Sequence, residues 1–185
     1  LDTNYRKTFP VFEDHLSSLL AAARLLYGRY DLSPSISSFS EIVDMDRDLY
    51  NRMSKIDSDM SFSDTAKTIK SRNYTLTHIQ RALLHYVMQL TKTDYDTYKS
   101  NGWIYYIRLI GLNTRAGGIV KQIKKNSYIP VITRAPEAAS VLSTVGKSMF
   151  GYDIKSTAIY NSLIYSAYGT KLKNEYEHTI PVITD

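Results

Sequence analysis

The amino-acid sequence predicts a mainly α-helical fold that carries a small, parallel β-sheet of two to three strands. Apolar residues recur at three- and four-residue steps within Ile69–Leu90, as they do on one face of a helix. Aromatic and β-branched residues fill Trp103–Leu112, which is predicted to be a mostly buried strand, and Tyr128–Thr133, a second predicted strand. Thr114–Lys125 between them has a helical pattern. A strand, a helix and a strand in this order form a βαβ unit, in which the two strands run parallel.

The composition is that of a globular protein with a moderate positive charge. Of 185 residues, 43% are apolar and 22% are charged, and the formal net charge is +5. This length suits a single domain, with a helical part over residues 1–100 and the βαβ unit plus C-terminal helices over residues 101–185. The absence of cysteine excludes disulfides, thiol catalysis and cysteine-ligated metals, and it fits a cytoplasmic protein. No apolar run is long enough to span a bilayer, and no signal peptide is visible.

The first predicted helix runs from just after Pro10 to about Tyr27. Gly28 suits the position that follows a helix end, because glycine adopts left-handed backbone angles without strain. The segment Asp31–Ser37 contains a proline and several serines and is predicted to be a loop.

Two capping patterns predict further helix starts. Ser38 and Glu41 have the spacing of a capping box, in which each side chain satisfies a backbone N–H of the first turn. The helix or turn that follows has four apolar positions, Ile42, Val43, Leu49 and Met53. Ser61 is predicted to cap a short helix that leads toward Lys70.

The most strongly patterned helix lies between Thr75 and Leu90. Thr75 is the predicted N-cap, and the residues of the apolar face are Leu76, Ile79, Leu83, Tyr86, Val87 and Leu90. At about 100° per residue, His78, Arg81 and His85 fall on roughly the opposite side, which we call the polar face. This face is predicted to border a cleft or solvent.

The last part of the chain is predicted to contain three strands and several helices. The strands are Tyr105–Leu109, Ile129–Thr133 and Ile180–Ile183, and the last two share the sequence Ile-Pro-Val-Ile, which a threonine follows in both places. A short helix is predicted within residues 91–102. Two helices are predicted in the remainder, from Pro136 to about Tyr168. The break between them is predicted near Phe150-Gly151-Tyr152, and Asp153 is the predicted cap of the second.

No catalytic motif is recognisable in the sequence. Phosphate loops of the Walker type, the G-x-G-x-x-G fingerprint, H-E-x-x-H and G-x-S-x-G are all absent. Gly117-Gly118 stands at the predicted strand-to-helix junction, where a phosphate could bind or a glycine pair could simply start the helix. His78 and His85 are about 10.5 Å apart along a helix axis, too far to share a metal ion. We therefore expect no metal site and no catalytic residue in this chain.

Basic residues stand beside aromatic residues at four places in the chain. The pairs and clusters are Arg72 with Tyr74, Arg81 with Tyr86, Arg108 with Tyr106, and Lys121, Lys124 and Lys125 with Tyr128. This mixture suits RNA, in which phosphates need cations and unpaired bases need flat surfaces. The alternative is that the arginines pair locally with Asp44, Asp46, Asp48 or Asp64.

Three blocks of the sequence resemble a known family. They are Asp48–Arg52 (DLYNR), Ile69–His85 (IKSRNYTLTHIQRALLH), and Tyr106–Lys125 running into Ile129–Thr133. In order and spacing they resemble the C-terminal half of the bacterial tRNA(Met) cytidine acetate ligases, which are HIGH-type nucleotidyltransferase-like proteins. The chain begins at Leu1, and we expect it to be a fragment of such a protein.

The resemblance implies an ATP-dependent tRNA-modifying parent protein. Its N-terminal domain would activate acetate with ATP and transfer the acetyl group to the wobble cytidine of elongator methionine tRNA. The present chain would then need no cofactor of its own, and its partners would be that tRNA and the N-terminal domain. The alternative is a protein-interaction or dimerisation module without RNA contact, and a free-standing nucleotide-binding enzyme is the third hypothesis.

The residues that carry these expectations form two sets. The predicted RNA-binding residues are Lys70, Arg72, Tyr74, Arg81, His85, Arg108, Arg115, Lys121 and Lys124. The remaining family-motif residues are Asn51, Arg52, Thr75 and Gly111. The chain departs from the family at Arg47-Asp48, where an acidic-glycine lead is usual, and at Ala116-Gly117, where the family has Gly-Arg.

Overall fold

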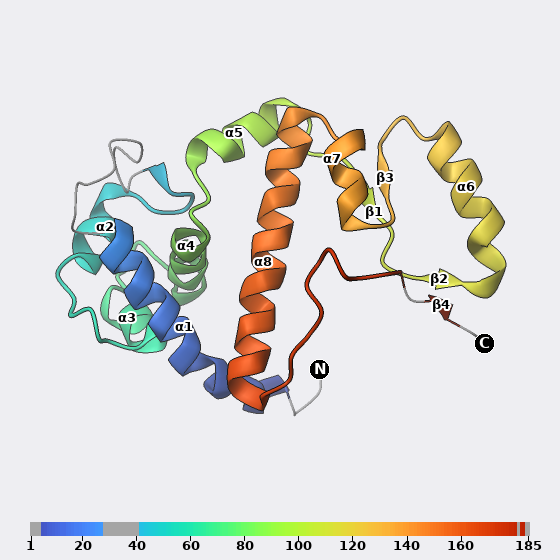
Figure 1. The fold of residues 1–185 in the computed structure, drawn as a ribbon. Coiled ribbons are helices and arrows are strands. Elements are labelled where there is room, and N and C mark those ends of the chain that lie inside the picture. Colours follow the sequence, from blue (N-terminus) through green and yellow to red (C-terminus); the bar gives the residue numbers. More distant parts are fainter. Residues whose placement is uncertain (1–4, 28–40, 181, 184–185) are drawn as a thin grey trace. The chain divides into compact units, whose positions relative to one another are not determined.

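The computed structural model describes residues 5–27, 41–180 and 182–183, and its fold is mainly α-helical with short parallel strands (Figure 1). This confirms the predicted fold class. The chain forms two compact units: unit 1 comprises Leu1–Tyr95 and Ser162–Thr170, and unit 2 comprises Asp96–Asn161 and Lys171–Asp185. No helix among the described residues is long and apolar enough to cross a membrane.

Unit 1 is built from helices that pack on one another. They are α1 (Tyr5–Tyr27), α2 (Arg47–Met53), α3 (Phe62–Thr68) and α4 (Leu76–Met88). Helices α1, α3 and α4 all contact one another. The end of helix α8 (Thr144–Tyr168) also belongs to this unit: His15 Nε2 of α1 lies 3.1 Å from the hydroxyl of Ser162, and Phe12 packs edge-on against Tyr168.

Side-chain oxygens start three of these helices. Thr75 Oγ1 accepts from His78 N at 3.2 Å and Ser61 Oγ accepts from Asp64 N at 3.1 Å, which confirms both predicted caps. Asp46 Oδ1 accepts from Leu49 N at 2.8 Å and caps α2. Each oxygen satisfies a backbone donor that has no partner within the helix.

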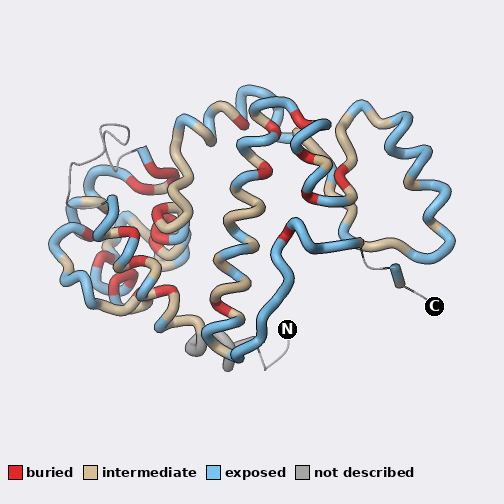
Figure 2. The backbone as a smooth tube through the Cα atoms, viewed as in Figure 1, coloured by how far each residue is buried: buried red, intermediate tan, exposed pale blue. Residues whose placement is uncertain are grey.

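The core of unit 1 forms around the apolar face of α4. Ile79, Leu83 and Tyr86 are fully buried, and so are Ile42, Met45 and Leu49 of the preceding segment. Figure 2 shows this concentration of buried positions in α2, α3 and α4. The periodicity of the sequence therefore predicted correctly which face of α4 enters the core.

Helix α1 is attached to its neighbours by polar side chains as well as by its apolar face. The Arg24 guanidinium donates to Asp57 O at 2.8 Å and to the carbonyl oxygens of Met53, the last residue of α2, and of Ile56. At the start of α3, Glu13 Oε1 accepts from Ser63 N at 2.6 Å. A carboxylate is favoured there by the partial positive charge of a helix N-terminus.

Unit 2 contains the strands, and its elements are short except for α8. In chain order they are α5 (Lys92–Ser100), β1 (Ile107–Arg108), β2 (Leu112–Asn113), η2 (Thr114–Ala116), α6 (Gly117–Asn126), β3 (Val131–Ile132), η3 (Ala135–Glu137), α7 (Ala138–Val141), α8 (Thr144–Tyr168) and β4 (Val182–Ile183). The first residues of α5 and the last of α8 lie in unit 1. The core of unit 2 consists of Ile132, Ala135, Ala138, Leu142 and Phe150, with Tyr106 and Ile154 packed against it.

The strands form two separate two-stranded parallel sheets. Strand β1 pairs with β3, with Ile107 opposite Val131, and the helix α6 connects them as predicted for a βαβ unit. Strand β4 pairs with β2, with Leu112 opposite Val182. The two Val-Ile pairs, Val131-Ile132 and Val182-Ile183, thus run parallel to successive parts of the segment 107–113.

Two predicted features of unit 2 are wrong. The stretch Trp103–Leu112 is not a buried strand: Ile104 is 66% exposed and Ile110 is 82% exposed. In a larger parallel sheet, helix layers bury both faces of each strand. Among the described elements, no such layers cover this two-stranded sheet, so these side chains stay exposed. The helix break is also misplaced, since α8 continues through Phe150-Gly151-Tyr152 and the interruption falls at Leu142-Ser143. Glycine costs only about 1 kcal/mol within a helix, and Phe150 is buried there.

In unit 1, the boundaries of two predicted elements need correction. Helix α1 begins at Tyr5 and includes Pro10, rather than starting after it. The helix predicted around Ile42 and Leu49 begins only at Arg47, where Asp46 provides its cap. Ser38, Gly28 and the predicted loop Asp31–Ser37 lie outside the described residues.

Neighbouring leucines of α4 test the assignment of its buried face. Leu83 is fully buried, whereas Leu84 is 41% exposed. We expect Leu83→Ala to lower the free energy of unfolding by about 2–5 kcal/mol, because the substitution leaves a cavity in a packed core. The control Leu84→Ala is expected to lower it by less than about 1 kcal/mol. Urea unfolding of both variants measures the difference, and equal losses would show that the helix is oriented differently.

Candidate functional site

The polar face of α4 packs against the segment that precedes α2. Arg81 Nε lies 2.6 Å from Asp44 Oδ2, and its Nη2 lies 3.1 Å from Asp44 Oδ1, a two-point contact between a guanidinium and a carboxylate. The guanidinium holds the pKa of Asp44 below its ordinary value. Asp44 has a φ of 61°, in the left-handed region that non-glycine residues rarely adopt. The contact with Arg81 helps to hold this backbone conformation.

His85 reaches the same carboxylate from the next turn of α4. Its Nδ1 lies 3.1 Å from Asp44 Oδ2 but is not aligned for a hydrogen bond. Burial lowers the pKa of His85, although the negative charge of Asp44 acts in the opposite direction. His85 is therefore held largely neutral in the folded chain at pH 7.

His78 and Tyr74 complete this cluster at the start of α4. His78 Nε2 lies 3.1 Å from Asp44 O, and its ring stacks on Tyr74 at 5.6 Å between centroids. The Tyr74 hydroxyl donates to Asp46 Oδ2, which raises the pKa of Tyr74 to about 12. The structure thus places three predicted RNA-binding residues, Tyr74, Arg81 and His85, next to two aspartates of the loop before α2. Tyr74 contacts Asp46, and the other two contact Asp44.

The other sequence-predicted residues of unit 1 lie around this cluster or apart from it. Lys70 and Arg72 are exposed in the turn before α4, where Ser71 and Tyr74 form an isolated bridge. Arg52 of α2 pairs with Asp48 at 2.9 Å, and its neighbour Asn51 is exposed. Thr75 acts as the helix cap, which is sufficient to explain its presence in the motif.

In unit 2, Arg108 lies at the centre of a cluster formed by two carboxylates and an aromatic ring. Its guanidinium is paired with the buried carboxylate of Glu175, lies 3.7 Å from Asp153 Oδ2, and stands over the ring of Phe150 at 5.6 Å. Asp153 does not cap a helix, as the sequence predicted, but lies within α8 and accepts from the Tyr106 hydroxyl at 2.6 Å. Burial, together with this hydrogen bond, raises the pKa of Tyr106. Arg108 is therefore fixed in place with its charge compensated.

The remaining basic candidates of unit 2 lie on or next to α6. Lys124 Nζ donates to Glu137 Oε2 and to Thr133 Oγ1, both at 2.7 Å. Burial would raise the pKa of Glu137, but the hydrogen bonds from Lys124 and Thr133 outweigh it and lower that pKa to about 2. Lys121 is exposed on α6, and Arg115 is exposed in η2.

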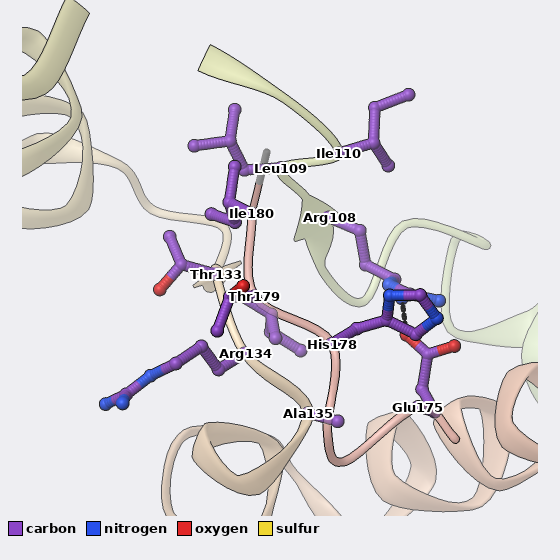
Figure 3. A pocket seen from close by; sticks show the side chains of 11 residues that line it. Arg108, Leu109, Ile110, Thr133, Arg134, Ala135, Glu175, His178, Thr179 and Ile180 are labelled. Carbon is purple, nitrogen blue, oxygen red and sulfur yellow. Dashed lines mark hydrogen bonds and ion pairs between the residues drawn. The ribbon is translucent and has the colours of Figure 1, made fainter. Parts of the chain in front are cut away.

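A pocket of about 220 Å³ opens beside Arg108 (Figure 3). The residues that line it are Arg108, Leu109, Ile110, Ile132, Thr133, Arg134, Ala135, Glu175, His178, Thr179 and Ile180. Figure 3 shows Arg108, Glu175 and His178 together, Leu109 close to Ile180, and Ile110 apart from that pair. Gly111 follows this stretch and connects β1 to β2.

Sequence reasoning missed the acidic partners in unit 2. Pairing of the arginines with aspartates, the alternative to RNA binding, holds for Arg81 with Asp44 in unit 1, but no sequence pattern indicates Glu175 or Glu137 as a partner. Arg108 and Glu175 are 67 residues apart, so no local spacing indicates their contact. Within the described part of the chain, no group of three or more histidine, aspartate and glutamate residues could hold a metal ion.

Comparison with known proteins gives a consistent family assignment. A family model described as HIGH Nucleotidyl Transferase matches residues 3–176. The match extends beyond Thr133, where the last of the three resembling blocks ends. The tRNA(Met) cytidine acetate ligase of Clostridium perfringens is 31% identical over 116 residues, 63% of this chain and 26% of that protein. The ligase of Halothermothrix orenii is 34% identical over 122 residues, 63% of this chain and 28% of the relative. That of Clostridium kluyveri is 28% identical over 167 residues, 86% of this chain and 38% of the relative.

Solved structures show a similar fold. Crystal structures of Thermotoga maritima TmcAL, one bound with alpha-thio ATP and one without, match with a TM-score of 0.73 at 16% sequence identity. The match covers 95% of this chain and 42% or 41% of those chains. The present chain therefore spans well under half the length of the relatives that it matches.

The buried environment of His85 predicts a pH dependence of stability. Because the pKa of His85 is lowered in the folded state, the unfolded chain takes up a proton at this residue near pH 6.5, whereas the folded chain takes it up only at lower pH. The free energy of unfolding should therefore fall as the pH falls from about 7 to about 5. We expect His85→Gln to lose less stability than the unsubstituted chain over this range, measured by urea unfolding at constant ionic strength. Parallel pH profiles for the two proteins would contradict the assignment.

Proposed function

Because the chain belongs to the HIGH nucleotidyl transferase family, we propose that it is the C-terminal, tRNA-contacting part of a protein of the tRNA(Met) cytidine acetate ligase type. In this proposal the parent protein acetylates the wobble cytidine of elongator methionine tRNA with ATP in the cytoplasm. The ATP chemistry belongs to an N-terminal domain outside this chain, and the chain contributes RNA binding. The similarity to proteins named tRNA(Met) cytidine acetate ligase supports this substrate.

The proposal rests above all on basic side chains that form no ion pair with an acidic residue of the described segments. Lys70, Arg72 and Lys121 are exposed, and none of them has an ion pair among those found in the described residues. Such side chains can neutralise phosphates without first losing an internal partner. Lys70 and Arg72 precede α4 directly, so the buried face of that helix holds their turn in a fixed place.

The other basic candidates have a second role that the proposal must accommodate. Arg81, Arg108 and Lys124 each pair with a carboxylate. Arg81 is nevertheless 55% exposed at its side chain, so a phosphate can approach it while it remains bound to Asp44. In the proposal, Arg81 and His85 mainly position the loop before α2, and Lys70 and Arg72 contact the RNA.

Salt dependence of tRNA binding distinguishes these roles. We expect the double substitution Lys70→Gln, Arg72→Gln to weaken binding and to reduce the slope of log affinity against log salt by about 0.7–0.9 per lost phosphate contact. The melting temperature should stay within a few degrees, because both side chains are exposed. Filter binding at several salt concentrations, with a thermal melt of each variant, provides the two measurements.

Arg81→Gln is the matched control for this experiment. It removes one charge of the same kind but leaves Asp44 without its guanidinium partner, so the main effect should be a lower melting temperature. If the double variant keeps the original affinity and slope, the turn before α4 does not contact tRNA and the proposal fails for this site.

A second function has one observation in its favour. The apolar side chains of α6 are uncovered, with Ile119 57% exposed and Ile123 46% exposed, and Figure 2 shows no buried position along this helix. A protein-interaction or dimerisation module would use such a face. It would show self-association in sedimentation experiments together with no salt-sensitive binding of tRNA.

The placement of the ATP chemistry outside this chain is also testable. The sequence contains no phosphate-binding motif, so we expect the purified 185-residue chain to produce no acetyl-adenylate from acetate and ATP. Acetate-dependent exchange of pyrophosphate into ATP measures this reaction directly. We also expect ATP to leave the melting temperature unchanged, since a ligand that binds the folded state raises it. Turnover by the chain alone would favour the hypothesis of a free-standing nucleotide-binding enzyme.

A further inference from the structure

The pocket beside Arg108 lies where parallel strands end. Leu109 and Ile110 directly follow β1, and Thr133, Arg134 and Ala135 directly follow β3, its parallel partner. In open α/β sheets, ligands bind in the crevice beyond the carboxyl ends of the parallel strands, and the pocket has the same position relative to β1 and β3. A third wall comes from the C-terminal segment through His178, Thr179 and Ile180 (Figure 3).

The charged groups at the polar end of the pocket do not favour an anion, and Arg134, which also lines the pocket, pairs with Glu137 at 3.4 Å. Arg108 is paired with the buried Glu175 and is within 3.7 Å of Asp153. A phosphate entering beside Arg108 would lie close to the Glu175 carboxylate and would be repelled by it. The pair instead presents a donor and an acceptor next to each other, with the imidazole of His178 beside them (Figure 3).

The size and the apolar walls favour one flat group. The pocket volume of about 220 Å³ is smaller than the roughly 300–1,000 Å³ of pockets that enclose drug-sized ligands. Leu109 and Ile180 provide an apolar surface away from the polar end, and Ile110 provides a separate apolar contact. A ring system with hydrogen-bonding edges matches both parts of this lining.

We propose that this pocket binds a single unpaired nucleobase of RNA. The face of the base packs against Ile110 and Ile180, and its edge meets the polar end of the pocket. There Glu175 accepts from an amino or ring N–H group, and Arg108 donates to a ring nitrogen or carbonyl oxygen. Proteins that recognise RNA by sequence commonly bind unpaired bases in this way, by stacking and by edge hydrogen bonds. The inference rests on the proposed function, because it names the part of the RNA that unit 2 would hold.

Neutral nucleosides separate base binding from phosphate binding. The chain contains four histidines, so the ring signals of His178 can be assigned by comparison with His178→Ala in NMR spectra of the 185-residue chain. We expect at least one of cytidine, uridine, adenosine and guanosine to shift the His178 signals in a saturable manner. Inorganic phosphate at the same concentration should leave them in place.

Two exposed isoleucines of the same stretch provide a matched pair of variants. Ile110 lines the pocket and is 82% exposed, whereas Ile104 is 66% exposed and does not line it. Ile110→Ala should weaken nucleoside binding roughly tenfold, because it removes an apolar contact with the base. Ile104→Ala should leave the affinity unchanged. Both side chains are largely exposed, so both variants should fold.

The outcomes separate this inference from the proposed function. No shift of His178 with any nucleoside, or an equal shift with phosphate, would overturn the base pocket, even if tRNA binding through Lys70 and Arg72 holds. Equal effects of Ile110→Ala and Ile104→Ala would overturn it as well. Saturable nucleoside binding in a chain that shows no salt-sensitive tRNA binding would support the pocket while the proposed function fails.

Discussion

The burial of one face of α4 is the interaction on which unit 1 depends. Ile79, Leu83 and Tyr86 have no exposed surface, and the Tyr86 hydroxyl donates to Ala23 O of α1 at 3.2 Å. Once this face is fixed against α1 and α3, the opposite face must point Arg81 and His85 at the segment before α2. The Asp44 carboxylate meets them there, so the core packing and the polar cluster are two consequences of one helix orientation.

Charge compensation divides the basic residues of the molecule into two groups. Arg81, Arg108 and Lys124 are bound to Asp44, Glu175 and Glu137, which orders these side chains but cancels most of their long-range attraction for a polyanion. The exposed cations at Lys70, Arg72 and Lys121 keep that attraction. An RNA-binding role would therefore use the second group for affinity, and ordered pairs such as Arg108 with Glu175 for recognition of individual groups.

The two-stranded sheets of unit 2 are too small to form a layer of the fold, but the pairing of β1 with β3 positions the residues of the pocket. Each sheet has two strands, so it leaves Ile104 and Ile110 exposed, yet the parallel pairing of β1 and β3 brings the residues after both strands to one place. The C-terminal segment then closes this place because Glu175 binds Arg108. The pocket thus depends on one parallel pair and one ion pair.

The sequence alone determined the features that depend on neighbouring residues: the fold class, the caps at Thr75 and Ser61, the buried face of α4, and the βαβ order with parallel strands. These follow from local hydrogen bonds and from helical periodicity, which are written into residues three or four positions apart. Only the tertiary structure decided the partners of the basic residues, since Arg81 and Asp44 are 37 positions apart and Arg108 and Glu175 are 67 apart. It also decided that α8 continues through Gly151, because the burial of Phe150 outweighs the local preference for a break. Contacts between distant segments follow from how the whole chain packs, and no local pattern specifies them.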